Sequence, residues 1–199
     1  MLESLSEEKL KHLISFDVEV NGRIPGKHSM LQLGAVCFDL KGREIAFFVM
    51  NLKPLPGAGE DPETMKWWSE QPKEAWERVT KNPVDSKIVT RKFFDWMAQF
   101  QKPVLFAAPV MLDGYWLRYY LETYIGSSGF SLFHATLDAR SICLPLTEYY
   151  PNSWKEWVRA VTECTIENSS PHYALADARE QGQLIFELFK WAKIHLMEE

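Results

Sequence analysis

The chain has 199 residues, of which 46% are hydrophobic and 14% aromatic, and this composition predicts one compact domain over residues 1–199 with a sizeable core. Its net charge of -5 excludes a strongly basic surface of the kind that coats nucleic acid, but it does not exclude catalysis on a nucleic acid. The three cysteines form no C-x-x-C pair, which argues against a disulfide framework and against a thiolate zinc site.

The first predicted element is a strand over residues 14–20 that carries two carboxylates among apolar residues. Side chains alternate along a strand, so Asp17 and Glu19 point to one side and the apolar side chains point to the other. Two like charges on a largely buried element repel each other and resist desolvation, which indicates a positive partner, most economically a divalent metal ion. An isolated D-x-E pattern is more often a solvated acidic face, so further acids must join this pair.

The remaining elements alternate between strands and helices along the chain. After turn formers at 21–28, the predicted strands are 30–39, 44–51, 103–108 and one within 132–143. The predicted helices are 62–69 with Asp61 as its N-cap, then short helices, then 86–100, 113–125, 154–164 and a last helix from Ala174 onward. This order predicts an α/β domain with a mixed sheet flanked by helices.

Two more acids and a histidine lie where they could reach the first strand. Asp113 falls just beyond the fourth strand at the opening of a helix, and Asp177 lies in the first turn of the last helix. On a continuous helix His172 would be turned roughly 140° away from Asp177, so we place it on the preceding loop. From that loop His172 could swing over a metal bound by Asp177 and accept a proton from water.

Together these motifs resemble those of the DEDDh branch of the DnaQ-like 3′→5′ exonucleases. The first motif is matched by 16–19 with 30–36, the second more loosely by 105–117, and the third by 172–178. The segment at 61–68 is similar to a small bacterial and phage group described as exoribonuclease-like. The resemblance covers roughly residues 12 to 190, and it implies a ribonuclease-H-like fold with a mixed five-stranded sheet flanked by helices.

The resemblance also implies a two-metal phosphodiesterase. Asp17, Glu19, Asp113 and Asp177 would hold two Mg²⁺ or Mn²⁺ ions, because oxygen-only ligands favour these hard ions over zinc. His172 would serve as the general base for the attacking water. The implied reaction releases nucleoside 5′-monophosphates one at a time from the 3′ end of single-stranded RNA or DNA, with RNA favoured by the subgroup resemblance.

The sequence departs from the family pattern at three positions around the first two motifs. Val20 stands where a threonine is common, Pro109 where an asparagine is common, and Leu112 where a phenylalanine is frequent. A better local copy of the second motif occurs at 94–96, whose acid is Asp95, but that segment lies inside a predicted helix before the strand. The order of elements favours Asp113 over this alternative.

The identity of the general base has an alternative as well. Tyr173 lies four residues before Asp177, as in the related DEDDy branch, so it competes with His172 for the role of base. The pattern H-x-A-L-x-D-A favours His172 and leaves Tyr173 as a packing residue.

The expected partner is a single-stranded nucleic acid end. Trp67 and Trp68 could stack a base, although with eight tryptophans in the chain core packing is expected for at least one of them. Arg23, Lys27 and Arg179 could touch the phosphate backbone, but a solvated surface role is the simpler interpretation of each.

Two other functions stay open at this point: a catalytically silent nucleic-acid-binding domain of the same fold, and a phosphohydrolase acting on nucleotides or dinucleotides. We also expect no membrane segment and a cytoplasmic location, since residues 1–11 are charged and no long apolar run occurs. A homodimer is possible, because dimers occur among relatives.

Overall fold

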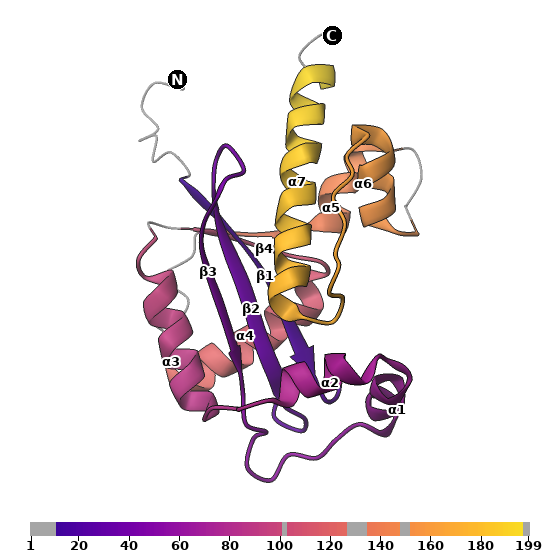
Figure 1. Cartoon of the computed structure of the whole chain (residues 1–199). Helices are drawn as coiled ribbons and strands as arrows, with labels where there is room; N and C mark the ends of the chain where they lie inside the picture. The colour runs from indigo at the N-terminus through magenta and orange to yellow at the C-terminus, as the bar shows by residue number, and fades with distance from the viewer. Residues whose placement is uncertain (1–10, 101–102, 127–134, 148–151, 197–199) are drawn as a thin grey trace.

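The central sheet has five strands in the residues that the structure, a computed structural model, describes, namely 11–100, 103–126, 135–147 and 152–196. They are β1 (His12–Val20), β2 (Met30–Asp39), β3 (Glu44–Asn51), β4 (Val104–Ala107) and β5 (Ala135–Asp138), in the order β3-β2-β1-β4-β5 (Figure 1). The first three strands pair antiparallel, whereas β4 runs parallel to β1 and β5 runs parallel to β4. The prediction of a mixed five-stranded sheet is therefore confirmed.

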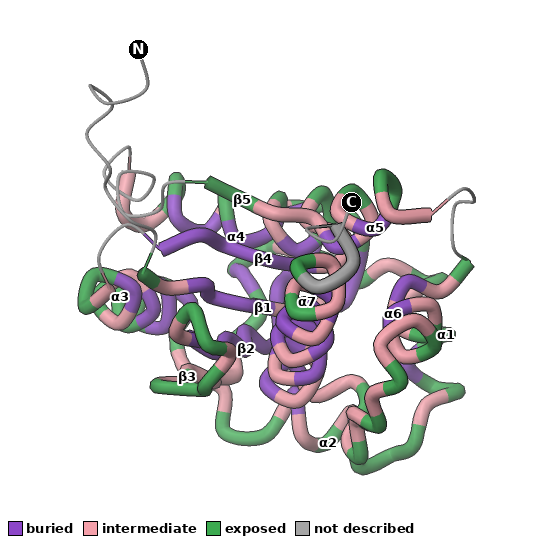
Figure 2. The backbone as a smooth tube through the Cα atoms, turned by 90° about the horizontal axis from the view of Figure 1, so that it is seen from above, coloured by how far each residue is buried: buried purple, intermediate pink, exposed green. Residues whose placement is uncertain are grey.

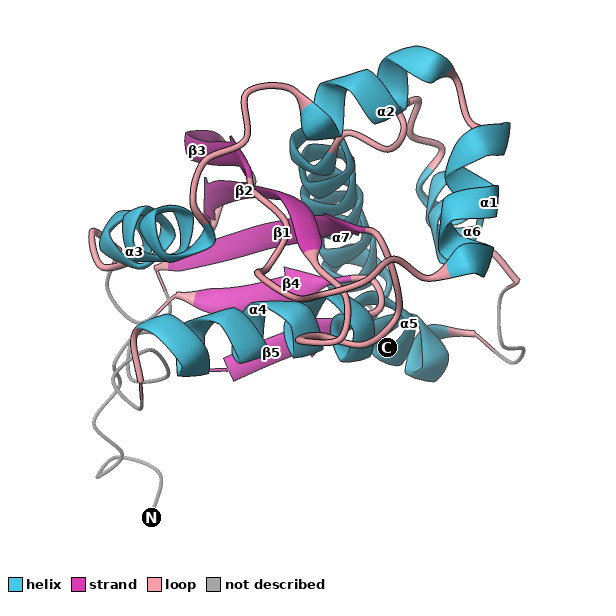
Figure 3. Cartoon of the chain, turned by 90° about the horizontal axis from the view of Figure 1, so that it is seen from below, coloured by secondary structure: helices cyan, strands magenta, loops and turns pink. Residues whose placement is uncertain are grey.

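Helices cover both faces of this sheet and one of its ends. They are α1 (Pro62–Glu70), α2 (Lys73–Thr80), α3 (Ser86–Met97), α4 (Val110–Tyr124), α5 (Ala139–Cys143), the 3₁₀ turn η2 (Leu144–Leu146), α6 (Trp154–Thr162) and α7 (Ala174–Leu196). Helices α3 and α4 lie on one face and α7 crosses the other, with α6 packed beside α7 (Figure 2). Helices α1 and α2 lie beyond the carboxyl end of β1 (Figure 3). Among the described helices, none combines the length and the apolar character that a membrane span requires.

The two faces of β1 are as different as the sequence pattern predicts. Ile14, Phe16 and Val18 belong to the apolar core between the sheet and helices α3 and α4. The alternate side chains of β1, including Asp17, face α7, where Leu13 joins the second core with α6 and α7. This alternation places the carboxylates of β1 under the start of α7, on the side away from the α3 and α4 core.

Helix α4 begins three residues earlier than the sequence predicted. Its N-cap, Pro109, has no side chain that can accept a hydrogen bond, and a cis peptide bond joins it to Ala108. The backbone N–H of Val110 instead donates to Oδ2 of Asp138, at the end of β5, over 2.9 Å. The earlier start moves Asp113 from the predicted first position of the helix into its first turn. The predicted helix at 86–100 ends at Met97, and residues 132–134 of the predicted βα unit lie outside the described residues.

The start of α7 is held directly against β2. Gln32 accepts a hydrogen bond from the backbone N–H of Ala174 over 2.9 Å, and its amide donates to Asn51 on β3 over 2.6 Å. Two residues beyond Gln32 on β2, Gly34 leaves room for the helix backbone, because a Cβ there would lie 2.3 Å from the backbone of Ala174 and of Leu175. Contact this close fixes where the first turn of α7 sits on the sheet.

We expect Gly34→Ala to destabilise the protein by about 2 kcal/mol, because the new methyl group meets backbone atoms that have no rotamer through which to move away. For a chain of this size that corresponds to a fall in melting temperature of roughly 4–8 °C. Gly59→Ala is the matched control, since a Cβ there meets nothing within 4 Å. Calorimetry on both variants tests this close approach, and an unchanged melting temperature for Gly34→Ala would contradict it.

Candidate active site

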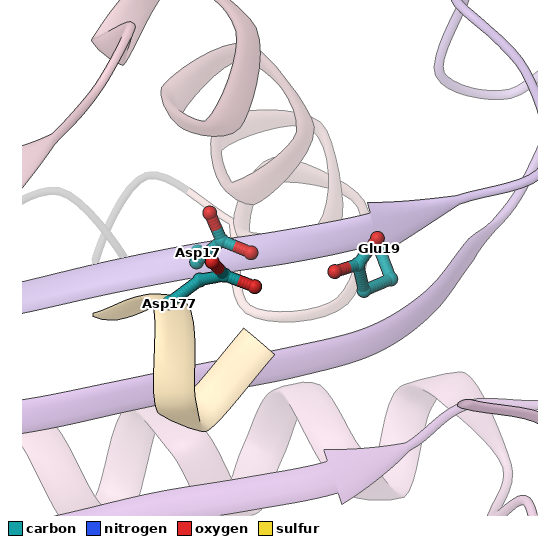
Figure 4. Close-up of side chains that lie close together, drawn as sticks. All are labelled: Asp17, Glu19 and Asp177. Carbon is teal, nitrogen blue, oxygen red and sulfur yellow. The ribbon is translucent and has the colours of Figure 1, made fainter. Parts of the chain in front are cut away.

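Three carboxylates meet where β1 passes beneath the start of α7. Asp17 and Glu19 come from β1, and Asp177 comes from the first turn of α7. One ligand oxygen from each lies within 4.8 Å of the other two (Figure 4). Spacing of this kind allows a single cation to touch all three side chains.

A fourth acid, Asp113, reaches the same place from α4. Its side chain is only 4% exposed, and its carboxylate accepts a hydrogen bond from the backbone N–H of Val18, the residue between Asp17 and Glu19. Its negative charge raises the pKa of both β1 acids, so the four carboxylates share one electrostatic environment. The rival candidate Asp95 is exposed on α3. The structure thus brings Asp113, and not Asp95, to the other acids.

Burial makes the ionised forms of these acids costly in the absence of a cation. The pKa of Asp17 is raised well above its ordinary value, first by burial and then by the charges of Asp113, Glu19 and Asp177. Glu19 behaves in the same way, and burial raises the pKa of Asp113 to about 7. A divalent cation would remove this penalty, and a donor set made only of carboxylate oxygens suits a hard ion such as Mg²⁺ or Mn²⁺.

His172 lies on the turn immediately before α7, as predicted. Its backbone has φ of 59°, and its backbone N–H donates a hydrogen bond to the carboxylate of Asp177. Its ring stands edge-on to Trp67, with 4.7 Å between the ring centroids. The neighbouring Tyr173 packs beneath the guanidinium of Arg78, whose central carbon lies 5.1 Å from the centre of the phenol ring.

The family model of the 3'-5' exoribonuclease Rv2179c-like domain matches residues 12–189. The chain belongs to the Rv2179c-like exoribonuclease family. It is 30% identical over 181 residues to the 3'-5' DNA exonuclease Cap18 of Escherichia coli. The aligned region covers 86% of this chain and 88% of Cap18.

Solved structures show that this Rv2179c-like chain shares its fold with E. coli exonuclease I and S. pombe Pop2p. The zinc-bound complex of E. coli ExoI with single-stranded DNA matches 94% of this chain and 41% of its own, at 15% identity and a TM-score of 0.69. Pop2p of S. pombe, in its Mg²⁺- and Mn²⁺-bound form, matches 88% of this chain and 82% of its own, at 13% identity and a TM-score of 0.65. The chain therefore spans less than half the length of the ExoI chain. The predicted DnaQ-like, ribonuclease-H-like fold is confirmed.

The three positions at which this Rv2179c-like chain departs from the family pattern differ in their surroundings. The backbone carbonyl of Val20 accepts a hydrogen bond from the indole of Trp68 over 2.9 Å, which ties the end of β1 to α1, but the structure gives no reason for valine at this position. Pro109 has no side chain that can cap α4, and Asp138 accepts the hydrogen bond from the first N–H of the helix instead. Leu112 is 44% exposed on α4 and is not needed to fill the core.

The aromatic pair on α1 divides between the core and the surface. Trp68 is 3% exposed, so the expectation that at least one of the two packs in the core is confirmed, whereas Trp67 is 39% exposed beside His172. Two of the predicted surface cations form ion pairs: Arg23 binds Glu63 over 2.6 Å, and Arg179 binds Glu44. Lys27 is exposed.

Sequence reasoning missed several polar groups that touch the acids. Gln181 donates to Oδ1 of Asp17 over 3.0 Å, and Asn168 donates to Oδ1 of Asp177 over 2.9 Å. The Nζ of Lys155, on α6, lies 3.8 Å from the same Asp177 oxygen. Gln181 could have been found, because it follows Asp177 by four residues and so shares its face of the helix. The other two come from a loop and a separate helix, and no spacing in the sequence marks them.

Proposed function

We propose that the protein is a two-metal 3′→5′ exonuclease that shortens single-stranded RNA or DNA and releases nucleoside 5′-monophosphates. The observation that carries this proposal is the convergence of Asp17, Glu19, Asp113 and Asp177 in one buried, mutually repelling group. Membership of an exoribonuclease family supports it. A purely structural role would not explain why four costly carboxylates are kept together when, among the described residues, Lys155 beside Asp177 is the one cation within 4 Å of any of them.

The four acids are proposed to hold two Mg²⁺ or Mn²⁺ ions. Asp17, Glu19 and Asp177 are the close ligand group, and Asp113 completes the set from the far side of β1. When bound, such ions supply an activated water and stabilise the departing 3′ oxygen. Gln181 and Asn168 orient one oxygen each of Asp17 and Asp177, and the backbone N–H of His172 also holds the Asp177 carboxylate, so these hydrogen bonds fix how the two acids face the ions.

His172 is proposed to take the proton from the attacking water. Two contacts hold His172 in position for this role. Its backbone N–H donates to the carboxylate of Asp177, and its ring packs edge-on against Trp67. An imidazole exchanges protons near neutral pH, so it suits a general base at the rim of a site made of carboxylates. Tyr173 is held by packing and by Arg78 and is not needed in this scheme.

Comparing His172→Ala with Tyr173→Phe separates the two candidate bases. We expect the histidine change to lower kcat by about 100-fold, within the range for loss of a general base, and the tyrosine change to alter it less than about threefold. Hydrolysis of a 5′-labelled oligomer should be followed at saturating Mg²⁺, with thermal melting as a check on folding. Loss of turnover in Tyr173→Phe alone would reverse the assignment.

RNA is the proposed preferred substrate. The matched family is described as exoribonuclease, whereas Cap18 is named a DNA exonuclease, so both sugars belong in the same experiment. The exposed face of Trp67 beside His172 can stack a base of either polymer.

The deciding assay incubates the purified protein with 5′-labelled RNA and DNA oligomers, in Mg²⁺, in Mn²⁺ and with a chelator. Stepwise shortening that requires the metal and yields 5′-monophosphates is the expected result. Metal-dependent cleavage of dinucleotides without trimming of longer oligomers would point to a phosphohydrolase. If none of these substrates is cleaved, the proposal that the protein is an enzyme is rejected.

A further inference from the structure

Lys155 extends from the first turn of α6 to the rim of the acid group. Its Nζ lies 3.8 Å from Oδ1 of Asp177 and 2.6 Å from Oε2 of Glu180. Its positive charge acts on the carboxylates, because it opposes the burial that raises the pKa of Asp177 and of Asp17. Its side chain is 27% exposed, so it is not sealed inside the core.

Glu180 holds this lysine in place. It is 6% exposed and lies one turn after Asp177 on α7, where Lys155 and Arg159 of α6 both bind its carboxylate. Arg159 also donates its Nε hydrogen to the carbonyl of Ile166 over 2.7 Å, so the arginine is fixed from two directions. One cation is enough to neutralise Glu180. Because two cations bind Glu180, the three side chains together carry a net charge of +1. The ammonium of Lys155 places this charge close to Asp177.

The surplus charge has no carboxylate left to neutralise once the site is loaded. Four carboxylates are balanced by two divalent cations under the proposed function, on which this inference rests. The network of Lys155, Arg159 and Glu180 then still carries one positive charge beside the metal site. A phosphodiester carries one negative charge, and a lysine ammonium binds such a group as a compact point charge.

We propose that Lys155 binds a backbone phosphate of the nucleic acid at the active site, held for this by Glu180. Two of the surface cations considered from sequence differ from it. Arg23 is paired with Glu63 and Asp61, and Arg179 is paired with Glu44, so the charge of each is already taken up. Lys155 is thus a substrate-contacting residue in addition to the acids and His172.

The salt dependence of binding tests this directly. A fluorescent single-stranded RNA or DNA 10-mer is titrated with the wild-type protein in Ca²⁺, with its integrity checked on a gel, at several KCl concentrations. For Lys155→Met we expect weaker binding and a slope of log Kd against log salt that is smaller by about 0.7, the contribution of one phosphate contact on a single strand. Lys155→Arg keeps the charge and should keep the wild-type slope.

Lys190→Met is the matched control. Lys190 binds Glu187 over 2.6 Å on α7, and it lies thirteen residues beyond Asp177, roughly 20 Å along the helix. Its loss should leave both affinity and slope unchanged. Thermal melting of each variant shows whether it folds, and Lys155→Gln replaces the methionine variant if that one does not.

Each outcome bears on a different claim. A slope that falls in the neutral variants and is restored in Lys155→Arg supports the phosphate contact. Weaker binding or lost hydrolysis with the wild-type slope unchanged would mean that Lys155 only positions Asp177, and it would overturn this inference while leaving the exonuclease intact. Absence of binding by the wild-type protein itself would overturn both proposals.

Discussion

Asp17→Asn is expected to reduce oligonucleotide hydrolysis by at least about 10³-fold while the protein remains folded. Asp17 is the acid on which the charges of Glu19, Asp113 and Asp177 all act, so it lies at the centre of the group. The amide keeps the size of the side chain and an oxygen for the hydrogen bond from Gln181. It removes the charge that a divalent cation needs, and loss of electrostatic transition-state stabilisation has effects of this order. Initial rates at saturating metal and substrate provide the measurement.

Asp95→Asn is the control for this experiment. Asp95 is the acid of the competing second motif and is exposed on α3, so its loss should leave the rate unchanged. Equal losses in both variants would show that the effect does not come from the acid group. If the wild-type protein binds oligonucleotides without cleaving them and Asp17→Asn binds equally well, the protein is the catalytically silent nucleic-acid-binding domain instead.

The sheet was predictable because its signals are local. Period-two alternation in β1 separates Phe16 and Val18 from Asp17 and Glu19, and the structure keeps these two sets on opposite faces. The start of α4 was not predictable, because its first N–H is bound by Asp138, 28 residues later in the chain. A cap that comes from another strand leaves no mark in the residues around the helix terminus.

In the candidate site, too, some residues could be predicted from the sequence and others could not. The order of the motifs located Asp17, Glu19, Asp113 and Asp177, and the choice of Asp113 over Asp95 needed only the order of strand and helix. The charged network behind Asp177 could not be found this way, since Lys155 and Glu180 are 25 residues apart on different helices. Their contact depends on how α6 packs against α7, which is a tertiary property and not a pattern of spacing. The roles of all these residues stay predictions until variants are assayed.

The metal-free protein is expected to lose stability as the pH rises from 5 to 8. In the folded state the pKa of Asp113 is about 7, against an ordinary value of 3.8, and the pKa of Asp17 and of Glu19 is also raised. The folded state therefore binds more protons than the unfolded state between these values, so the free energy of unfolding falls as the pH rises through that window. From pH 5 to 8 Asp113 alone accounts for about 3 kcal/mol.

Mg²⁺ should reverse this dependence, because bound cations favour the ionised carboxylates and stabilise the folded state in proportion to their binding. Thermal melting at pH 5 and pH 8, with and without Mg²⁺, should show a larger gain from the metal at pH 8. Comparison with Asp113→Asn isolates the contribution of that acid from the titration of histidines, since the variant should lose about 3 kcal/mol of the pH dependence. The metal-free wild type could instead melt at the same temperature at both pH values and behave like Asp113→Asn. That result would mean that the carboxylates are not buried together, and the metal site inferred from their burial would be rejected.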